Sequence, residues 1–168
     1  MRSRSMLLTS APLLALCLYS GAAVADLKVL DLFIGSWDID AETLQPTPGT
    51  AHYSERYDWV LDGKFLRGET GRKADGSQDI VFGTYDAQAD GYTFWIFSSS
   101  GSFIYLPPGS WDERRRIMEW RNPKGFDLNY YSSCRFPDRD NRYCDLIMKD
   151  WKGQVILELK WHAMRRAD

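Results

Sequence analysis

The chain has 168 residues, a formal net charge of −2 at pH 7 and an aromatic content of 14%, with seven tryptophans. This length fits a single domain with one buried core. Because the sequence contains no long basic run, it argues against a protein that binds nucleic acid.

The N-terminal segment has the order of a secretory signal peptide. Arg2 and Arg4 precede an apolar run that ends in the small residues Ala23-Val24-Ala25, as in a cleavable signal. We predict a signal peptide over residues 1–25 and a mature domain over residues 26–168, located in a bacterial periplasm or secreted. Loss of the two arginines leaves 19 basic and 23 acidic residues, a formal charge of about −4, and no transmembrane segment is expected after cleavage.

Two other interpretations of this segment are weaker. A membrane anchor needs roughly 20 consecutive apolar residues, but Thr9, Ser10 and Pro12 interrupt this run. A lipoprotein would be modified at Cys17, but Leu16 stands where lipid-modified signals carry a small residue.

The first predicted element of the mature domain is a short helix over residues 26–33. Apolar residues recur at three- to four-residue spacing from Leu27 to Phe33, and Asp26 can cap the first turn. Gly35 is expected to end this helix.

After this glycine the apolar period changes to two, which predicts a half-buried strand. Trp37, Ile39 and Ala41 share one face, and Asp38 and Asp40 share the other. We expect both carboxylates to face solvent, which argues against a paired-carboxylate active site here.

Turn signals then recur about every 10 to 15 residues, with strand-like runs between them. Asp-Gly pairs are strong hairpin signals because both residues accept positive φ. The pattern predicts an all-β fold, an antiparallel up-and-down meander of about ten strands closed into a barrel; a two-sheet sandwich is the alternative. The signals are Asp62-Gly63, Asp75-Gly76, Asp90-Gly91, Ser100-Gly101, Pro107-Pro108-Gly109, Asn122 to Gly125, Pro137 to Asn141 and Lys152-Gly153.

Two cysteines remain in the mature domain, Cys134 and Cys144. An even count in an exported chain indicates a disulfide and an oxidising compartment. Pairing the strands across residues 137–141 places both thiols opposite each other on the apolar face. We therefore predict a disulfide that staples this hairpin and has no redox role.

The Gly35-x-Trp37 pair behind a short helix, followed by a meander, resembles the calycin-like barrels. These include the lipocalins and, with a closer likeness, an uncharacterised family of bacterial secreted lipocalin-like proteins of unknown function. The stretches that carry the closer likeness are LDLFIGSW (30–37), WVLDGKFL (59–66), GTYD (83–86) and Tyr92 to Phe97.

The resemblance implies a structural role for Trp37. In lipocalins the tryptophan of this motif packs across the barrel floor beneath a basic side chain near the C-terminus. Alternation along the last strand selects Arg165 rather than Arg166 for that side chain. We predict that Arg165 stacks over Trp37 as a structural contact.

The chain resembles the nitrobindin-like haem proteins more distantly, and these use a histidine of a C-terminal strand as the axial ligand. His162 would be that ligand here, which makes a haem-binding barrel one alternative. However, His162 shares its strand face with Glu158 and Lys160, whereas haem needs an imidazole in an apolar cavity. No cofactor and no metal site is expected, because His52 and His162 show no metal-ligand spacing with other residues.

One predicted hairpin is apolar on both faces, over residues 92–106. Its outer face needs a cover, either the N-terminal helix or a second copy of the protein. A homodimer through this surface is therefore expected slightly ahead of helix cover. Further along, Arg114 to Arg116 begin the predicted strand that continues to Trp120. If Met118 and Trp120 point inward, Arg114 and Arg116 share their side and would attract an anion at the barrel mouth; a solvated turn is the favoured interpretation.

The sequence favours a non-enzymatic barrel that binds a small apolar or amphipathic molecule in its lumen. The alternatives are a filled barrel with a structural or interaction role and, less favoured, an isomerase or cyclase acting on an enclosed substrate. No catalytic residue is assigned. The candidate wall residues, from strand parity, are Tyr57, Trp59, Phe94, Tyr105, Trp120 and Tyr130, with Arg116 as a candidate anion contact.

Overall fold

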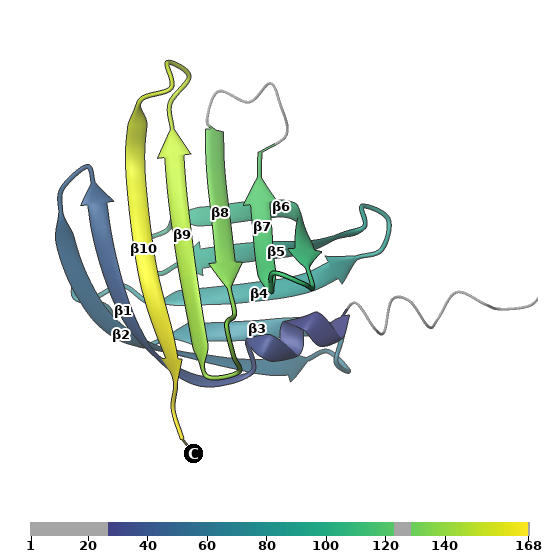
Figure 1. The fold of residues 1–168 in the computed structure, drawn as a ribbon. Coiled ribbons are helices and arrows are strands. Elements are labelled where there is room, and N and C mark those ends of the chain that lie inside the picture. The colour runs from purple at the N-terminus through teal and green to yellow at the C-terminus, as the bar shows by residue number, and fades with distance from the viewer. Residues whose placement is uncertain (1–26, 123–128, 168) are drawn as a thin grey trace, which may run out of the picture.

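The computed structural model describes residues 27–122 and 129–167 as ten antiparallel strands that close into a barrel, preceded by one short helix (Figure 1). Each strand pairs with the next in sequence, and β10 closes the barrel against β1. This confirms the predicted meander and excludes the sandwich. The elements are η1 (Lys28–Leu32), β1 (Gly35–Gln45), β2 (Gly49–Val60), β3 (Phe65–Thr70), β4 (Asp79–Asp86), β5 (Gly91–Ser98), β6 (Phe103–Asp112), β7 (Ile117–Arg121), β8 (Asn129–Arg135), β9 (Asn141–Lys149) and β10 (Val155–Arg165).

The tight turns use the residues that the sequence offers for positive φ. Asp62 and Gly63 have φ values of 55° and 72° between β2 and β3, and Asp90 has 51° before β5. Because aspartate and glycine tolerate this region better than most residues, these pairs fix where the chain reverses.

One turn prediction near β6 is wrong. Residues 107–109 continue β6 instead of ending it, and the register with β5 shifts between Tyr92 and Phe94. Prolines occur within sheets at such irregular positions, where they need not donate to the ladder. The reversal comes later, at residues 113–116, so Arg114 to Arg116 form the turn that was the favoured interpretation of these residues. Residues 123–125 of the signal that begins at Asn122 lie outside the described residues.

The N-terminal helix is a single 3-10 segment and plugs one end of the barrel. Leu27 stands at its N-terminal boundary without a side-chain cap, and Asp26, the expected cap, lies outside the described residues. Leu30 and Phe33 are buried in the core. Trp37 Nε1 donates to the carbonyl of Phe33 at 2.7 Å, which joins the helix to β1.

Arg165 covers the same end of the barrel. Its guanidinium carbon lies 4.2 Å from the ring of Trp37, which is fully buried. It donates to the carbonyl of Ile34, and its Nε donates to the carbonyl of Arg139 at 2.8 Å. The last strand is thus fastened to the start of the first, beside the point where β1 and β10 close the barrel.

A disulfide joins Cys134 of β8 to Cys144 of β9, which lie directly opposite each other. The two residues are 10 apart in sequence, and closing a loop of this length stabilises the fold by about 3 kcal/mol through the lost entropy of the unfolded chain. Both side chains are buried on the inner face. A bond of this kind is compatible with an extracytoplasmic location.

The outer wall of β4, β5 and β6 carries two cross-strand rows of apolar side chains. Strand register aligns Ile80, Phe97 and Phe103 in one row and Phe82, Trp95 and Tyr105 in the other. We call these six residues the outer patch. Phe103 is 70% exposed and Phe97 is 46% exposed, so the expectation that the N-terminal helix covers this face is wrong: that helix is packed into the barrel end.

Within the described residues, no helix is long and apolar enough to cross a membrane.

Candidate ligand-binding site

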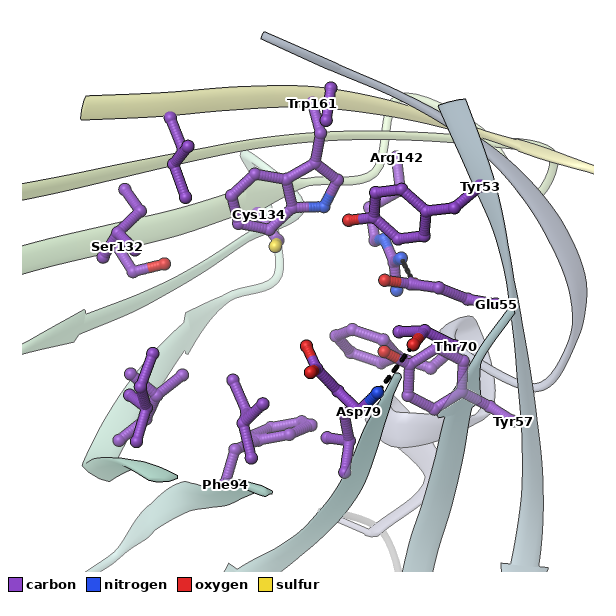
Figure 2. A pocket seen from close by; sticks show the side chains of 18 of the residues that line it. Tyr53, Glu55, Tyr57, Thr70, Asp79, Phe94, Ser132, Cys134, Arg142 and Trp161 are labelled. Carbon is purple, nitrogen blue, oxygen red and sulfur yellow. Dashed lines mark hydrogen bonds and ion pairs between the residues drawn. The ribbon is translucent and has the colours of Figure 1, made fainter. Parts of the chain in front are cut away.

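The barrel encloses a cavity of about 260 Å³ (Figure 2). Its wall is mainly apolar, because the inward positions of most strands carry aliphatic or aromatic residues. Large side chains contribute from several directions, among them Phe33 from the helix end, Phe94 from β5, Trp120 from β7 and Trp161 from β10. An apolar molecule in this cavity would therefore contact side chains from strands around the barrel.

An ion pair lies inside this apolar wall. Arg142 of β9 donates to Glu55 of β2, and the two residues are only 1% and 9% exposed. The guanidinium carbon also lies 5.0 Å from the ring of Phe33, 5.2 Å from that of Trp37 and 5.5 Å from that of Tyr57. The Arg142 guanidinium is therefore stabilised both by cation–π contacts with these rings and by the Glu55 carboxylate.

The pair fixes the charge state of its neighbours. Burial would lower the pKa of Arg142, but Glu55 and Tyr57 together outweigh this effect and the pKa is raised. Burial, reinforced by the same carboxylate, raises the pKa values of Tyr53 and Tyr57 well above their usual range. At neutral pH the cluster therefore presents a neutralised ion pair and two uncharged phenols.

A second ion pair lines the cavity. Lys73 donates to Oδ2 of Asp79, the first residue of β4, and the backbone N–H of Asp79 donates to Thr70 Oγ1 at 2.7 Å. The other carboxylate oxygen, Asp79 Oδ1, is buried and has no hydrogen-bond partner. Figure 2 shows the Asp79 carboxylate directed into the cavity. A ligand with an N–H or O–H group can satisfy this acceptor.

Three of the candidate wall residues predicted from strand parity line the cavity: Tyr57, Phe94 and Trp120. Trp120 is held by a 2.9 Å hydrogen bond from its Nε1 to the carbonyl of Tyr92, and its ring meets Phe94 edge to face at 5.3 Å. These contacts give the wall a fixed shape.

The structure places the other aromatic candidates elsewhere. Tyr105 lies on the outer face and is 45% exposed, because residues 103–106 are apolar on both faces and the β5–β6 register shift decides which side faces inward. Trp59 lies near the helix, where its Nε1 donates to Asp31 Oδ1 at 2.7 Å. Tyr130 donates to the carbonyl of Tyr105 at 3.3 Å, away from the cavity wall, and burial raises its pKa to about 12.

Arg116 is also outside the cavity. It occupies the turn before β7 with a φ of 53°, and its Nε donates to the carbonyl of Phe136 at 2.6 Å. Arg116 therefore takes no part in the cavity wall, and its anion contact stays a prediction. The guanidinium inside the barrel belongs to Arg142.

The sequence analysis missed the four charged residues that line the cavity. Glu55 falls on the inward face between Tyr53 and Tyr57, and Arg142 shares the face of Cys144. A charged residue at an inward-facing strand position could have indicated a buried ion pair, because a buried charge needs a partner inside the barrel. The partner could not be read from sequence, since β2 and β9 are distant along the chain.

Both histidines lie on the outer face. His162 Nε2 is 2.9 Å from Asn141 Oδ1, and its ring stacks on Tyr143 with centroids 4.2 Å apart. His52 Nδ1 is 2.8 Å from Asp40 Oδ1. This placement does not support the haem alternative built on His162. Over residues 27–122 and 129–167, no group of three or more His, Cys, Asp or Glu side chains is arranged to hold a metal.

Comparison with known proteins supports the fold. No protein-family model and no curated protein matches the chain. Its structure is similar to an S-type phycobiliprotein lyase from Guillardia theta, with a TM-score of 0.51 and 11% identity over 87% of this chain and 94% of that one. This likeness shows the fold alone, and with the closed ten-stranded barrel it is consistent with a calycin-like fold.

Two further solved structures are similar at lower scores. One is a protein of unknown function from the DUF3598 family of Nostoc punctiforme, with a TM-score of 0.48 and 10% identity over 82% of this chain. This chain spans about half the length of that protein, 49%. The other is a redesigned beta barrel, with a TM-score of 0.38 and 8% identity over 83% of this chain and 96% of that one.

Proposed function

We propose that this protein is an exported, non-enzymatic barrel that binds a small apolar or amphipathic molecule in its lumen. The observation that carries the proposal is the cavity of about 260 Å³, walled by aromatic and aliphatic side chains with a few fixed polar groups. Small-molecule sites have this construction, with volumes of about 300 to 1,000 Å³ for drug-sized ligands, so a cavity just below this range suits a small molecule. A scaffold with a filled interior would leave no such space.

The proposed export rests on one feature of the sequence and one of the structure. The segment over residues 1–25 has the order of a signal peptide, and the disulfide between Cys134 and Cys144 is of a type that persists in oxidising compartments. We further propose that the chain belongs among bacterial secreted lipocalin-like proteins, on the residues from Leu30 to Trp37 that resemble them.

A fluorescent probe tests the lumen directly. N-phenyl-1-naphthylamine is neutral and apolar, and it brightens when it leaves water. Ala41 lines the cavity, so Ala41→Phe adds bulk to the lumen; its neighbour Glu42 is exposed, so Glu42→Phe adds the same bulk to the outer wall. We expect Ala41→Phe to weaken probe binding by about tenfold or more, about 1.4 kcal/mol, and Glu42→Phe to leave it unchanged. Equal binding to all three proteins would contradict the proposal.

Native mass spectrometry of the protein purified from its own host identifies the natural ligand. A molecule retained in the lumen adds a fixed mass to the oxidised mature chain. The same spectrum reports cleavage of the signal peptide, because residues 1–25 are then missing from the mass. A chain that keeps these residues in the exported fraction would contradict the predicted cleavage.

The outer patch favours a second candidate function, association of two copies. Monomeric proteins rarely expose a contiguous apolar surface of this kind without use. Because the patch lies outside the barrel wall and the cavity lies inside it, a homodimer is compatible with ligand binding and does not replace it.

A further inference from the structure

The cavity adjoins a second hollow at the barrel mouth. A groove of about 290 Å³ lies between the turn before β4 and the β5–β6 turn, and it shares four lining residues with the cavity. The shared residues are Lys73, Asp79, Ile96 and Ile104. These four residues form the neck, so a molecule can lie with one end in the lumen and the other in the groove.

The groove differs from the lumen in chemistry. Ser98, Ser100 and Ser102 line it, with the Ser100 hydroxyl oxygen 3.1 Å from that of Ser98 and 3.0 Å from that of Ser102. Ser77, on the opposite side, donates to Asp75 Oδ1 at 2.7 Å. The Asp75 carboxylate also lines the groove, and its Oδ1 already accepts hydrogen bonds from the N–H and the hydroxyl of Ser77. Because hydroxyl groups both donate and accept hydrogen bonds and a carboxylate accepts them, the groove suits a polar group that donates hydrogen bonds.

The charges along the lumen cancel. Four charged side chains line it, and they form two pairs, Glu55 with Arg142 and Asp79 with Lys73. A carboxylate or ammonium ligand would enter without a counter-ion, and a buried charge without a partner is unfavourable by several kcal/mol. Among the described residues that line the lumen, two buried side-chain atoms lack hydrogen-bond partners: Asp79 Oδ1, an acceptor, and Arg142 Nε, a donor on a guanidinium that Glu55 already neutralises.

We propose that the ligand is an uncharged amphipathic molecule whose apolar body lies in the lumen and whose O–H or N–H group donates to Asp79 Oδ1 at the neck. Its polar end extends into the serine-lined groove. This inference rests on the proposed function, because it names the ligand class of the same cavity.

Three probes with the same apolar body separate the head groups. 1-Octanol, octanoate and octylamine compete with N-phenyl-1-naphthylamine at pH 7, where the alcohol is neutral and the others are charged. We expect 1-octanol to bind at least about tenfold more tightly than either ion. Octanoate or octylamine binding as tightly as the alcohol overturns the inference, as does a probe that sits in the lumen and is displaced by none of the three. A probe insensitive to Ala41→Phe would instead overturn the proposed function.

Variants at the neck change the preference in opposite directions. Asp79→Asn leaves the Lys73 ammonium unpaired, so we expect octanoate to bind about tenfold more tightly and 1-octanol to bind more weakly. Lys73→Met leaves the carboxylate unpaired and is expected to favour octylamine. Asp58→Asn, which breaks the exposed pair with Arg56 on the outer wall, is the matched control.

The outcomes at the neck are distinct. The inference would be overturned if Asp79→Asn and Lys73→Met bound the three probes with affinities within about twofold of the wild type. Such a change is smaller than the contribution of one hydrogen bond to a charged group. A change in Asp58→Asn as large as the one expected for the neck variants would also overturn it. If a neck variant fails to fold by circular dichroism, the wild-type series of three probes decides alone.

Discussion

Arg142 and Glu55 form an ion pair inside the barrel although they stand 87 positions apart in the chain. The order of strands around the barrel is β2, β1, β10, β9. The pair therefore spans the two strands whose contact closes the barrel. Arg165 over Trp37 fastens the same closure at the barrel end. Both contacts join the beginning of the domain to its end.

Removing one member of the buried pair is expected to destabilise the fold strongly. Glu55→Gln leaves the Arg142 guanidinium buried without a counter-charge, which typically lowers the free energy of unfolding by about 3–5 kcal/mol. Urea unfolding followed by tryptophan fluorescence measures this change. The double variant Glu55→Met with Arg142→Met should lose less than the sum of the two single changes, because it leaves no unpaired charge.

An exposed ion pair provides the control. Asp58→Asn removes the ion pair with Arg56 on the outer wall, where both side chains are more than half exposed, so we expect a change of no more than about 1 kcal/mol. Equal losses in Glu55→Gln and Asp58→Asn would show that burial of the Glu55–Arg142 pair adds nothing to stability.

Any side chain at Gly35 is expected to destabilise the fold. Its φ is 108°, and a Cβ atom there would lie 2.6 Å from Nη1 of Arg165. The Arg165 side chain could move aside, but it would then leave the Ile34 carbonyl and the ring of Trp37. We expect Gly35→Ala to lower the free energy of unfolding by about 1–3 kcal/mol. Gly49→Ala, where a Cβ meets open space, should be neutral or stabilising.

Local sequence patterns were sufficient to predict the fold. Asp62-Gly63 and Asp90-Gly91 lie at chain reversals, and ten strands result from the spacing of such signals. The register across residues 137–141 placed Cys134 opposite Cys144, as the structure has it. These predictions succeed because a tight turn and the period of a strand depend only on neighbouring residues.

Some residues of the site could be predicted from sequence and others could not, and the difference has a physical cause. Tyr57, Phe94 and Trp120 lie on strands with one apolar face, so alternation identifies them. Tyr105 lies in a run that is apolar on both faces, and a register shift that no local pattern reveals turns it outward. The pairing of Glu55 with Arg142 depends on closure of the barrel, which joins strands far apart in sequence.

Buried tyrosines are expected to make stability fall in alkaline solution. The pKa of Tyr57 is raised in the folded protein, first by burial and then by Glu55. The unfolded chain loses this proton near pH 10, so stability is fully present below about pH 10 and is lost as the pH rises toward the folded-state pKa. Above pH 10, one such tyrosine lowers the free energy of unfolding by about 1.4 kcal/mol per pH unit, and Tyr57→Phe should remove this contribution.

Urea unfolding between pH 9 and pH 11.5 measures that slope, and absorbance at 295 nm reports phenolate formation. Tyr143→Phe is the control, because Tyr143 lies on the outer face and is 39% exposed. A slope in Tyr57→Phe that equals the slope in Tyr143→Phe would contradict a special role of the buried phenol.

The outer patch is expected to hold two copies of the protein together. Phe97 and Phe103 face each other across β5 and β6 with ring centroids 6.5 Å apart, and both are exposed. Replacing both by serine removes apolar area that only a partner can bury. We expect sedimentation velocity to show a dimer for the wild type and a monomer for Phe97→Ser with Phe103→Ser. Leu61→Asn, at an equally exposed leucine in the β2–β3 turn, should stay dimeric. A monomeric wild type at the highest soluble concentration would rule out the homodimer.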